Sequence, residues 1–245
     1  MAKKPKTRKR QRKKRSGGMF VRLVQLGALI ALVGIIYSAW FWIDMRSWRP
    51  DEGTYPEQGA QIASGSAGVR FETLKATGAD FVYLELGEAT AAPDPGFRDR
   101  FGAARKAGLK VGVVHPFDPC LRADPQSARF TRMVARDQEL LPPAIALIRM
   151  PDECDTPVSE AAVTSEVLTL VNQIEAHAGQ PAIIKLGTEF EQAFRIAGSL
   201  DRDLWLMRDR SVPRYAGRPW LLWSANSQLV SEETGQPIEW VVVQR

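Results

Sequence analysis

Residues 78–115 read GADFVYLELGEATAAPDPGFRDRFGAARKAGLKVGVVH, and this stretch indicates the fold. It predicts a buried strand at Phe81–Leu86, an amphipathic helix at Gly96–Ala107 and a second buried strand at Lys110–His115. Gly78 and Gly108 follow helical stretches, where glycine often ends a helix. Strand–helix alternation with nearly continuous apolar strands is typical of a parallel sheet covered by helices.

The same alternation extends in both directions from this unit. The remaining expected strands are Gly59–Ala63, Ala144–Arg149, Pro181–Leu186, Leu204–Met207, Trp220–Ser224 and Ile238–Val243. The remaining expected helices are Val69–Ala76, Pro125–Arg136, Val158–Ala178 and Glu189–Ala197. The last three strands lack long intervening helices, so the end of the barrel or sheet is expected to be less regular.

Charge is distributed unevenly along the 245 residues, whose net charge is +5. Ten basic residues lie between Lys3 and Arg15, and no acidic residue precedes Asp44. From Asp44 onward the chain has 22 basic and 28 acidic residues, so the body is mildly acidic. A body of about 200 residues fits one domain with a sizeable core.

An uncharged stretch from Leu23 to Ile43 reads LVQLGALIALVGIIYSAWFWI. As a helix it would be about 32 Å long, enough to cross a bilayer core. Aromatic residues gather at its C-terminal end, and the basic run before it places the N-terminus in the cytoplasm by the positive-inside rule. A cleaved signal peptide is the main alternative, but no small-x-small cleavage site follows the apolar run.

We therefore expect four segments: a basic cytoplasmic tail (1–18), a transmembrane signal anchor (19–43), a linker (44–57) and a folded domain (58–245). The protein is expected to be a single-pass inner (cytoplasmic) membrane protein with a periplasmic, or more generally extracytoplasmic, body. Beside a spanning helix, the basic tail is interpreted as a topology determinant that contacts anionic lipid. A nucleic-acid partner is not expected.

Several motifs of the body resemble glycoside hydrolase family 25 lysozymes. Residues 78–88 resemble the second-strand motif of that family, and the residues from Asp94 to His115 resemble its pattern D..F......A..AGL.VG.YH. Leu141-Pro142-Pro143 precedes the strand where the family carries its catalytic D-x-E. Later residues follow the family's order: Pro181–Ile184, Phe190, Leu204-Trp205 and Trp220–Trp223. The resemblance extends from Gln58 to the C-terminus.

This resemblance implies an α/β fold, an irregular TIM-like (β/α)-barrel with its site at the C-terminal ends of the strands. It implies action on the β-1,4 bond between N-acetylmuramic acid and N-acetylglucosamine in peptidoglycan. No cofactor is expected. With two histidines and two cysteines, a His-rich or four-cysteine metal centre is not expected either.

The catalytic positions differ from the family pattern. The D-x-E aligns with Ala146 and Ile148, the first-strand Asp with Gln61, and the late-strand Asp with Glu239. The family's second-strand Lys is Glu85. Other family positions that differ are occupied by Val114, Lys185, Ser224 and Ala225. Glycoside hydrolysis needs a proton donor and a second carboxylate, so we expect the family's mechanism to be lost.

Relocated carboxylates are the counter-hypothesis. The acids at or near expected strand ends are Glu85, Glu88, Asp152, Glu153 and Glu239. Two of them, ~5–9.5 Å apart, would be able to act as a catalytic pair, with Glu85 and Glu239 as the main candidates. The competing interpretations are solvated charges, or an ion pair of Glu85 with Lys185 or Arg149.

Five residues are candidate ligand contacts: His115, Arg149, Lys185, Trp205 and Trp223. His115 is either a hydrogen-bonded wall residue or a glycan contact. The two tryptophans either stack on sugar faces or pack in the core. Arg149 either binds an anionic group or pairs with Asp152 or Glu153.

Cys120 and Cys154 each follow an expected strand, the third and fourth of the barrel, by a few residues. If these strands are neighbours, both thiols reach the same rim. An extracytoplasmic location permits oxidation, and we predict a disulfide.

The leading hypothesis is a membrane-anchored, non-catalytic module that binds peptidoglycan or a related glycan, with a possible cell-wall protein partner. The rival is an active muramidase that uses relocated acids. A third possibility is a structural membrane protein whose partner is another protein.

Overall fold

The computed structural model describes residues 17–88, 94–137, 139–230 and 236–244. The chain divides into two units, Met1–Asp44 and Met45–Arg245. The basic tail predicted at 1–18 lies, up to residue 16, outside the described residues.

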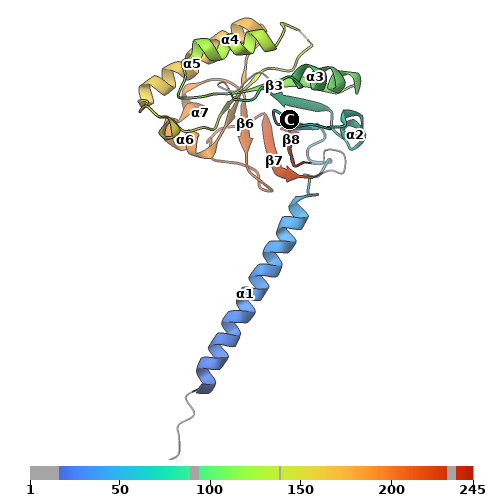
Figure 1. Cartoon of the computed structure of the whole chain (residues 1–245), viewed down its shortest axis with the longest axis vertical. Helices are drawn as coiled ribbons and strands as arrows, with labels where there is room; N and C mark the ends of the chain where they lie inside the picture. Colours follow the sequence, from blue (N-terminus) through green and yellow to red (C-terminus); the bar gives the residue numbers. More distant parts are fainter. Residues whose placement is uncertain (1–16, 89–93, 138, 231–235, 245) are drawn as a thin grey trace, which may run out of the picture. The chain divides into compact units, whose positions relative to one another are not determined.

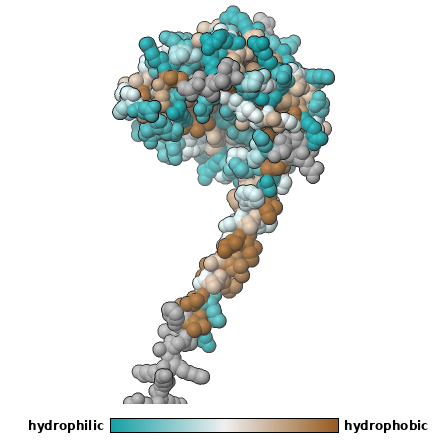
Figure 2. Space-filling model, viewed as in Figure 1, coloured by the Kyte–Doolittle hydropathy of each residue, from teal (hydrophilic) through white to brown (hydrophobic). Residues whose placement is uncertain are grey.

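The described part of the first unit is helix α1 (Gly17–Met45), except for the final residue of that helix. Figure 2 shows apolar side chains along this helix, and those from Val21 to Ile43 are exposed to a large extent. Within the described part of the chain, Val21–Met45 is the one helix long and apolar enough to cross a membrane. The single apolar N-terminal helix expected from the sequence is therefore present.

The second unit is a closed eight-stranded barrel in which each strand pairs with the next along the chain (Figure 1). Strands β1 to β7 pair in parallel, and β8 closes the barrel antiparallel to both β7 and β1. The strands are β1 (Gln58–Ile62), β2 (Phe81–Glu85), β3 (Lys110–Pro116), β4 (Ala144–Leu147), β5 (Ile183–Leu186), β6 (Leu204–Met207), β7 (Leu222–Leu229) and β8 (Ile238–Val243). The predicted irregular barrel is confirmed.

Helices alternate with the first six strands. They are α2 (Phe71–Ala76), α3 (Phe97–Lys106), α4 (Ala123–Met133), a 3₁₀ turn η1 (Pro151–Glu153), α5 (Glu160–Ala178), α6 (Thr188–Phe194) and α7 (Ile196–Ser199). The longest of those in the second unit, α5, begins at Ser159, whose hydroxyl accepts a hydrogen bond from the Ala162 N–H. It ends at Gly179, which has a left-handed φ of 74°.

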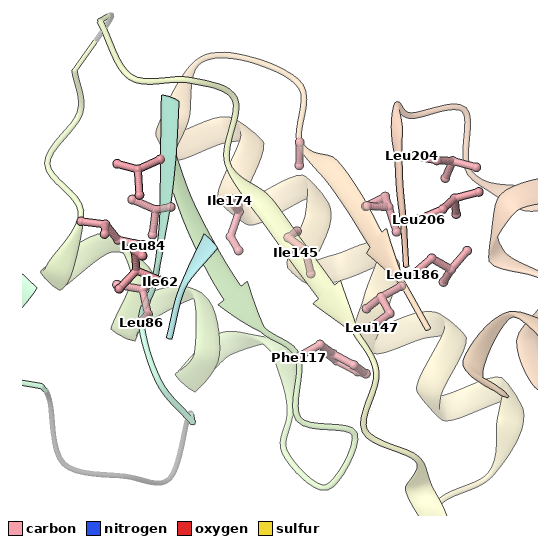
Figure 3. Packing of buried hydrophobic residues seen from close by; sticks show 14 of the residues in the cluster. Ile62, Leu84, Leu86, Phe117, Ile145, Leu147, Ile174, Leu186, Leu204 and Leu206 are labelled. Carbon is pink, nitrogen blue, oxygen red and sulfur yellow. The ribbon is translucent and has the colours of Figure 1, made fainter. Parts of the chain in front are cut away.

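The core has two layers because side chains alternate between the two faces of each strand. The outer layer packs strands against helices. Figure 3 shows Leu84, Ile145, Ile174 and Leu186 in this layer. The inner layer fills the barrel with Phe81, Tyr83, Val114, Ala144, Ala146, Ile183, Trp205, Leu222 and Val241.

Two glycines make room for aromatic rings inside the barrel. A Cβ on Gly112 would lie 2.3 Å from the Tyr83 ring, and a Cβ on Gly59 would lie 2.6 Å from the Phe81 ring. Cβ atoms do not approach other atoms so closely, and both contacts involve rigid rings. Glycine at these positions therefore allows the barrel interior to hold large side chains.

Some predicted boundaries were wrong. The helix expected at Glu189–Ala197 is two helices, because Arg195 adopts a left-handed φ of 50° between α6 and α7. Strand β4 ends at Leu147 rather than Arg149, and β7 covers Leu222–Leu229 rather than Trp220–Ser224.

The segment expected to be a linker contacts the barrel from Met45 onward. The buried Asn226 amide donates hydrogen bonds to the carbonyl oxygens of Met45, at 2.5 Å, and Trp48, at 2.8 Å. The Gln58 amide donates in the same way to Pro50 and Tyr55, at 3.2 and 2.8 Å. Residues 45–57 are therefore part of the folded unit.

Candidate functional site

Four polar side chains from different strands meet inside the barrel near the C-terminal ends of its parallel strands. These side chains belong to Gln61, Glu85, Lys185 and Glu239. Alternate residues of a strand face the same side, and each of the four lies two positions from a residue that faces the barrel interior, which is Gly59 for Gln61 and an inner-layer residue for the others. All four therefore point inward. Gln61 of β1 lies directly opposite Glu239 of β8 in the sheet. Closure of the barrel therefore brings together residues that are far apart in sequence.

Lys185 is the centre of this group, and its side chain is only 1% exposed. Its Nζ lies 2.6 Å from Gln61 Oε1 and 2.5 Å from Glu239 Oε1. It also lies 4.7 Å from the centre of the Trp205 ring. A buried ammonium group is costly unless it is paired, and here a carboxylate, an amide oxygen and an aromatic face all stabilise it.

Glu239 has a second partner. The Ser224 hydroxyl donates to Glu239 Oε1, and the Trp205 indole N–H donates to Ser224 Oγ at 2.6 Å. Oε1 of this carboxylate is thus held by Lys185 and Ser224 together.

Glu85 joins the group through Gln61, whose Nε2 donates to Glu85 Oε2 at 3.0 Å. Burial raises the pKa of the Glu85 carboxyl, and the Glu239 charge adds to the effect, whereas the nearby Lys185 opposes it. The Lys185 charge acts on Glu85, but among the described residues Glu85 forms no direct ion pair with Lys185 or Arg149. Lys185 pairs with Glu239, while Gln61 stands between Lys185 and Glu85.

An open pocket of about 1030 Å³ lies at this end of the barrel. Gln61, Glu85, Pro116, Ala146 and Ile148 line it from strands β1 to β4 or from the residues that directly follow them. Ala146 and Ile148 occupy the end of β4, and Ile148 is 45% exposed. The two positions aligned with the family's D-x-E therefore present only apolar side chains to the pocket.

Arg149 also lines the pocket, where two acids hold it. Its Nη1 lies 2.9 Å from Asp118 Oδ2, and its Nε lies 3.5 Å from Glu153 Oε2. Of the acids proposed from the sequence as its partners, Glu153 is found at ion-pair distance. Asp118 is a site residue that the sequence did not indicate, because no motif distinguishes it from other loop acids.

Cys120 and Cys154 are joined by a disulfide, with their Cα atoms 5.4 Å apart. Cys120 follows β3, Cys154 follows β4, and both line the pocket. The bond lies beside the Asp118–Arg149 ion pair, so the two loops that form this wall have a covalent and an ionic connection.

The other candidate contacts do not line the pocket. His115 is fully buried on the helix side of β3, with its ring centre 6.2 Å from that of Phe130, and burial lowers its pKa to about 4. Trp205 fills the barrel interior. The buried Trp223 ring packs against Tyr55 and Trp220 in the outer layer. Both tryptophans therefore occupy core positions.

Metal ligation is not indicated in the described ranges, which contain no group of three or more His, Cys, Asp or Glu side chains placed to hold an ion. The arrangement is instead an open pocket lined by both charged and apolar side chains. Barrel enzymes commonly place their active sites at this end of the strands.

Comparison with known proteins identifies the class. The family model for glycosyl hydrolases family 25 matches residues 61–230. A family 25 glycosyl hydrolase from Bacillus anthracis has a similar structure, with a TM-score of 0.72 and 22% identity over 82% of this chain and 93% of that one. A lysozyme from Streptomyces coelicolor has a TM-score of 0.67 and 16% identity, covering 77% and 92% of the two chains.

The chain belongs to glycosyl hydrolase family 25. An autolytic lysozyme of Clostridium acetobutylicum is 34% identical over 58 residues. That match covers 24% of this chain and 18% of the lysozyme. The barrel is thus a family 25 barrel.

Proposed function

We propose that this protein is a membrane-anchored module that binds peptidoglycan through the barrel pocket without hydrolysing it. Membership of family 25 and the open pocket at the family's site end support a glycan ligand. The apolar N-terminal helix supports membrane anchoring, with the basic tail in the cytoplasm and the barrel outside.

The proposal that the module does not hydrolyse glycan rests on the two residues at the C-terminal end of β4. Ala146 and Ile148 offer no proton donor and no carboxylate to a bound sugar. Losing general acid catalysis alone typically lowers a rate by ~10²–10⁴. Of the two inner acids, Glu239 is engaged by Lys185 and Ser224, and it does not line the pocket within the described residues.

A second candidate function is hydrolysis by relocated acids. One observation favours it: Glu85 lines the pocket and has a raised pKa, which is a property of general acids in glycosidases. It would require Glu239 to leave Lys185 and act across the scissile bond. On this alternative, Glu85→Gln and Glu239→Gln should each abolish the release of reducing ends from peptidoglycan.

Binding can be tested by sedimenting the full chain, in detergent, with purified peptidoglycan sacculi. Ile148→Arg places a long charged side chain in the pocket at an already exposed position, so it should abolish co-sedimentation. Leu168→Arg is the matched control, since Leu168 is 41% exposed on α5 and outside the pocket lining. Equal sedimentation of both variants would contradict binding through the pocket.

A further inference from the structure

The charges that line the pocket indicate which ligand charge it favours. Among the residues that the structure describes, its lining includes five carboxylates, Glu85, Glu88, Asp118, Glu153 and Asp155, and one guanidinium, that of Arg149. Arg149 is already paired with Asp118 at 2.9 Å and with Glu153 at 3.5 Å. The one cation of the lining is therefore compensated, and most of the acidic excess is not.

Two of these acids stand open to solvent at the rim. Glu88 and Asp155 are exposed, and neither has a hydrogen bond or ion pair with any other described residue. They come from the loops that follow β2 and β4, so a ligand in the pocket would meet carboxylates from both loops. An anionic substituent would be repelled there, and a cationic one attracted.

The apolar side of the pocket is a separate observation. Ile148 leaves 45% of its surface exposed, and Leu121 and Val158 line the pocket with it. A large apolar side chain exposed within a pocket favours a ligand that covers it with a hydrocarbon surface, such as a sugar face. Apolar lining and acidic rim together fit a ligand with an apolar face and a positive charge.

We propose that the pocket selects glycan segments that carry an ammonium group and discriminates against segments rich in carboxylates. This inference rests on the proposed glycan-binding function and names its ligand class. The ammonium group has two possible sources in a cell-wall glycan: a free 2-amino group on a sugar, or a side-chain amine on a stem peptide.

Two matched pairs of probes distinguish these sources. The first pair is a glucosamine hexamer and the N-acetylglucosamine hexamer. The second is a lysine-containing stem peptide with a free or an acetylated ε-amine. Dissociation constants are measured with the full chain in detergent. In one of the two pairs, the probe with the free amine should have a dissociation constant at least about fivefold lower than that of its acetylated partner. A difference of this size corresponds to two or three exposed ion pairs. The pair that shows this preference identifies the source.

Charge variants test whether the rim causes the preference. Glu88→Gln with Asp155→Asn should bring the ratio of dissociation constants close to one, and high salt should do the same. Glu72→Gln is the control, since Glu72 is exposed on α2 away from the pocket, and it should preserve the ratio.

Equal or tighter binding of the acetylated probe in both pairs, with binding to sacculi intact, would overturn this inference and leave the proposed function standing. Loss of binding to sacculi as well as to every probe would overturn both.

Discussion

Lys185 pairs with the inner carboxylate of Glu239 and so limits the chemistry that this carboxylate is able to perform. At 1% exposure it holds Glu239 at 2.5 Å and accounts for a carboxylate inside a largely apolar barrel. Removing one partner of a buried ion pair leaves the other charge uncompensated, which is costly. Pairing thus allows both charges to be buried at the mouth of the barrel.

Lys185→Met should therefore lower the free energy of unfolding of residues 45–245 by about 3 kcal/mol. Lys185→Met with Glu239→Leu should cost less than the single change, because both charges are then absent. Urea unfolding measures both variants. If the single variant stays within about 0.5 kcal/mol of the parent protein, Glu239 does not depend on Lys185.

The buried His115 should make the stability of the fold sensitive to acid. Its pKa is lowered from about 6.5 in the unfolded chain to about 4, so the folded state holds the ring neutral. As pH falls through 6.5, the unfolded state binds a proton that the folded state does not, and stability is lost until pH reaches about 4.

His115→Leu removes this proton linkage. Between pH 7 and pH 5 the parent should lose about 2 kcal/mol more unfolding free energy than the variant does. Urea titrations at the two pH values give the comparison. The same dependence in His115→Leu would show that other groups cause it.

At the scale of elements, the disulfide connects the loops after β3 and β4 across a sequence separation of 34 residues. Replacing Cys120 and Cys154 by serine should lower the unfolding free energy by about 2–4 kcal/mol, chiefly by freeing the unfolded chain. Unfolding of the parent with and without reductant provides the comparison, since the reduced parent should match the variant. Unchanged stability of the variant would mean that the bond does not constrain the unfolded chain.

Most helices and strands could be predicted from apolar runs and from glycines that end helices. The bounds of β6 and β8 were predicted correctly because Leu204–Met207 and Ile238–Val243 are apolar runs with clear ends. The break at Arg195 could not be predicted, because no glycine or proline marks the left-handed residue. The end of β7 was missed because its ladder with β8 continues through polar residues and register shifts.

The site was less predictable than the fold. The sequence indicated Gln61, Lys185 and Glu239 one by one, but their contact depends on closure of β8 onto β1. Trp205 and Trp223 were ambiguous because a ring that stacks on sugar and a ring that packs in a core have the same sequence signature. Barrel geometry placed both in the core.

At the scale of the molecule, the charge distribution and the hydropathy favour one topology. The basic N-terminal run precedes an apolar helix, and the mildly acidic body follows it. A barrel placed outside the cytoplasm would meet the cell wall, in an environment where the Cys120–Cys154 bond persists. The pocket, the apolar N-terminal helix and the disulfide are therefore consistent with a single proposed role at the cell wall.

We propose that this family 25 barrel binds glycan without cleaving it. The most direct measurement incubates the full chain, in detergent, with sacculi and detects new reducing-end muramic acid by mass spectrometry, with an active muramidase as positive control. We predict no release above a heat-inactivated sample, while the protein sediments with the sacculi. Release that disappears in Glu85→Gln or Glu239→Gln would show that the barrel is an enzyme and would assign catalysis to relocated carboxylates.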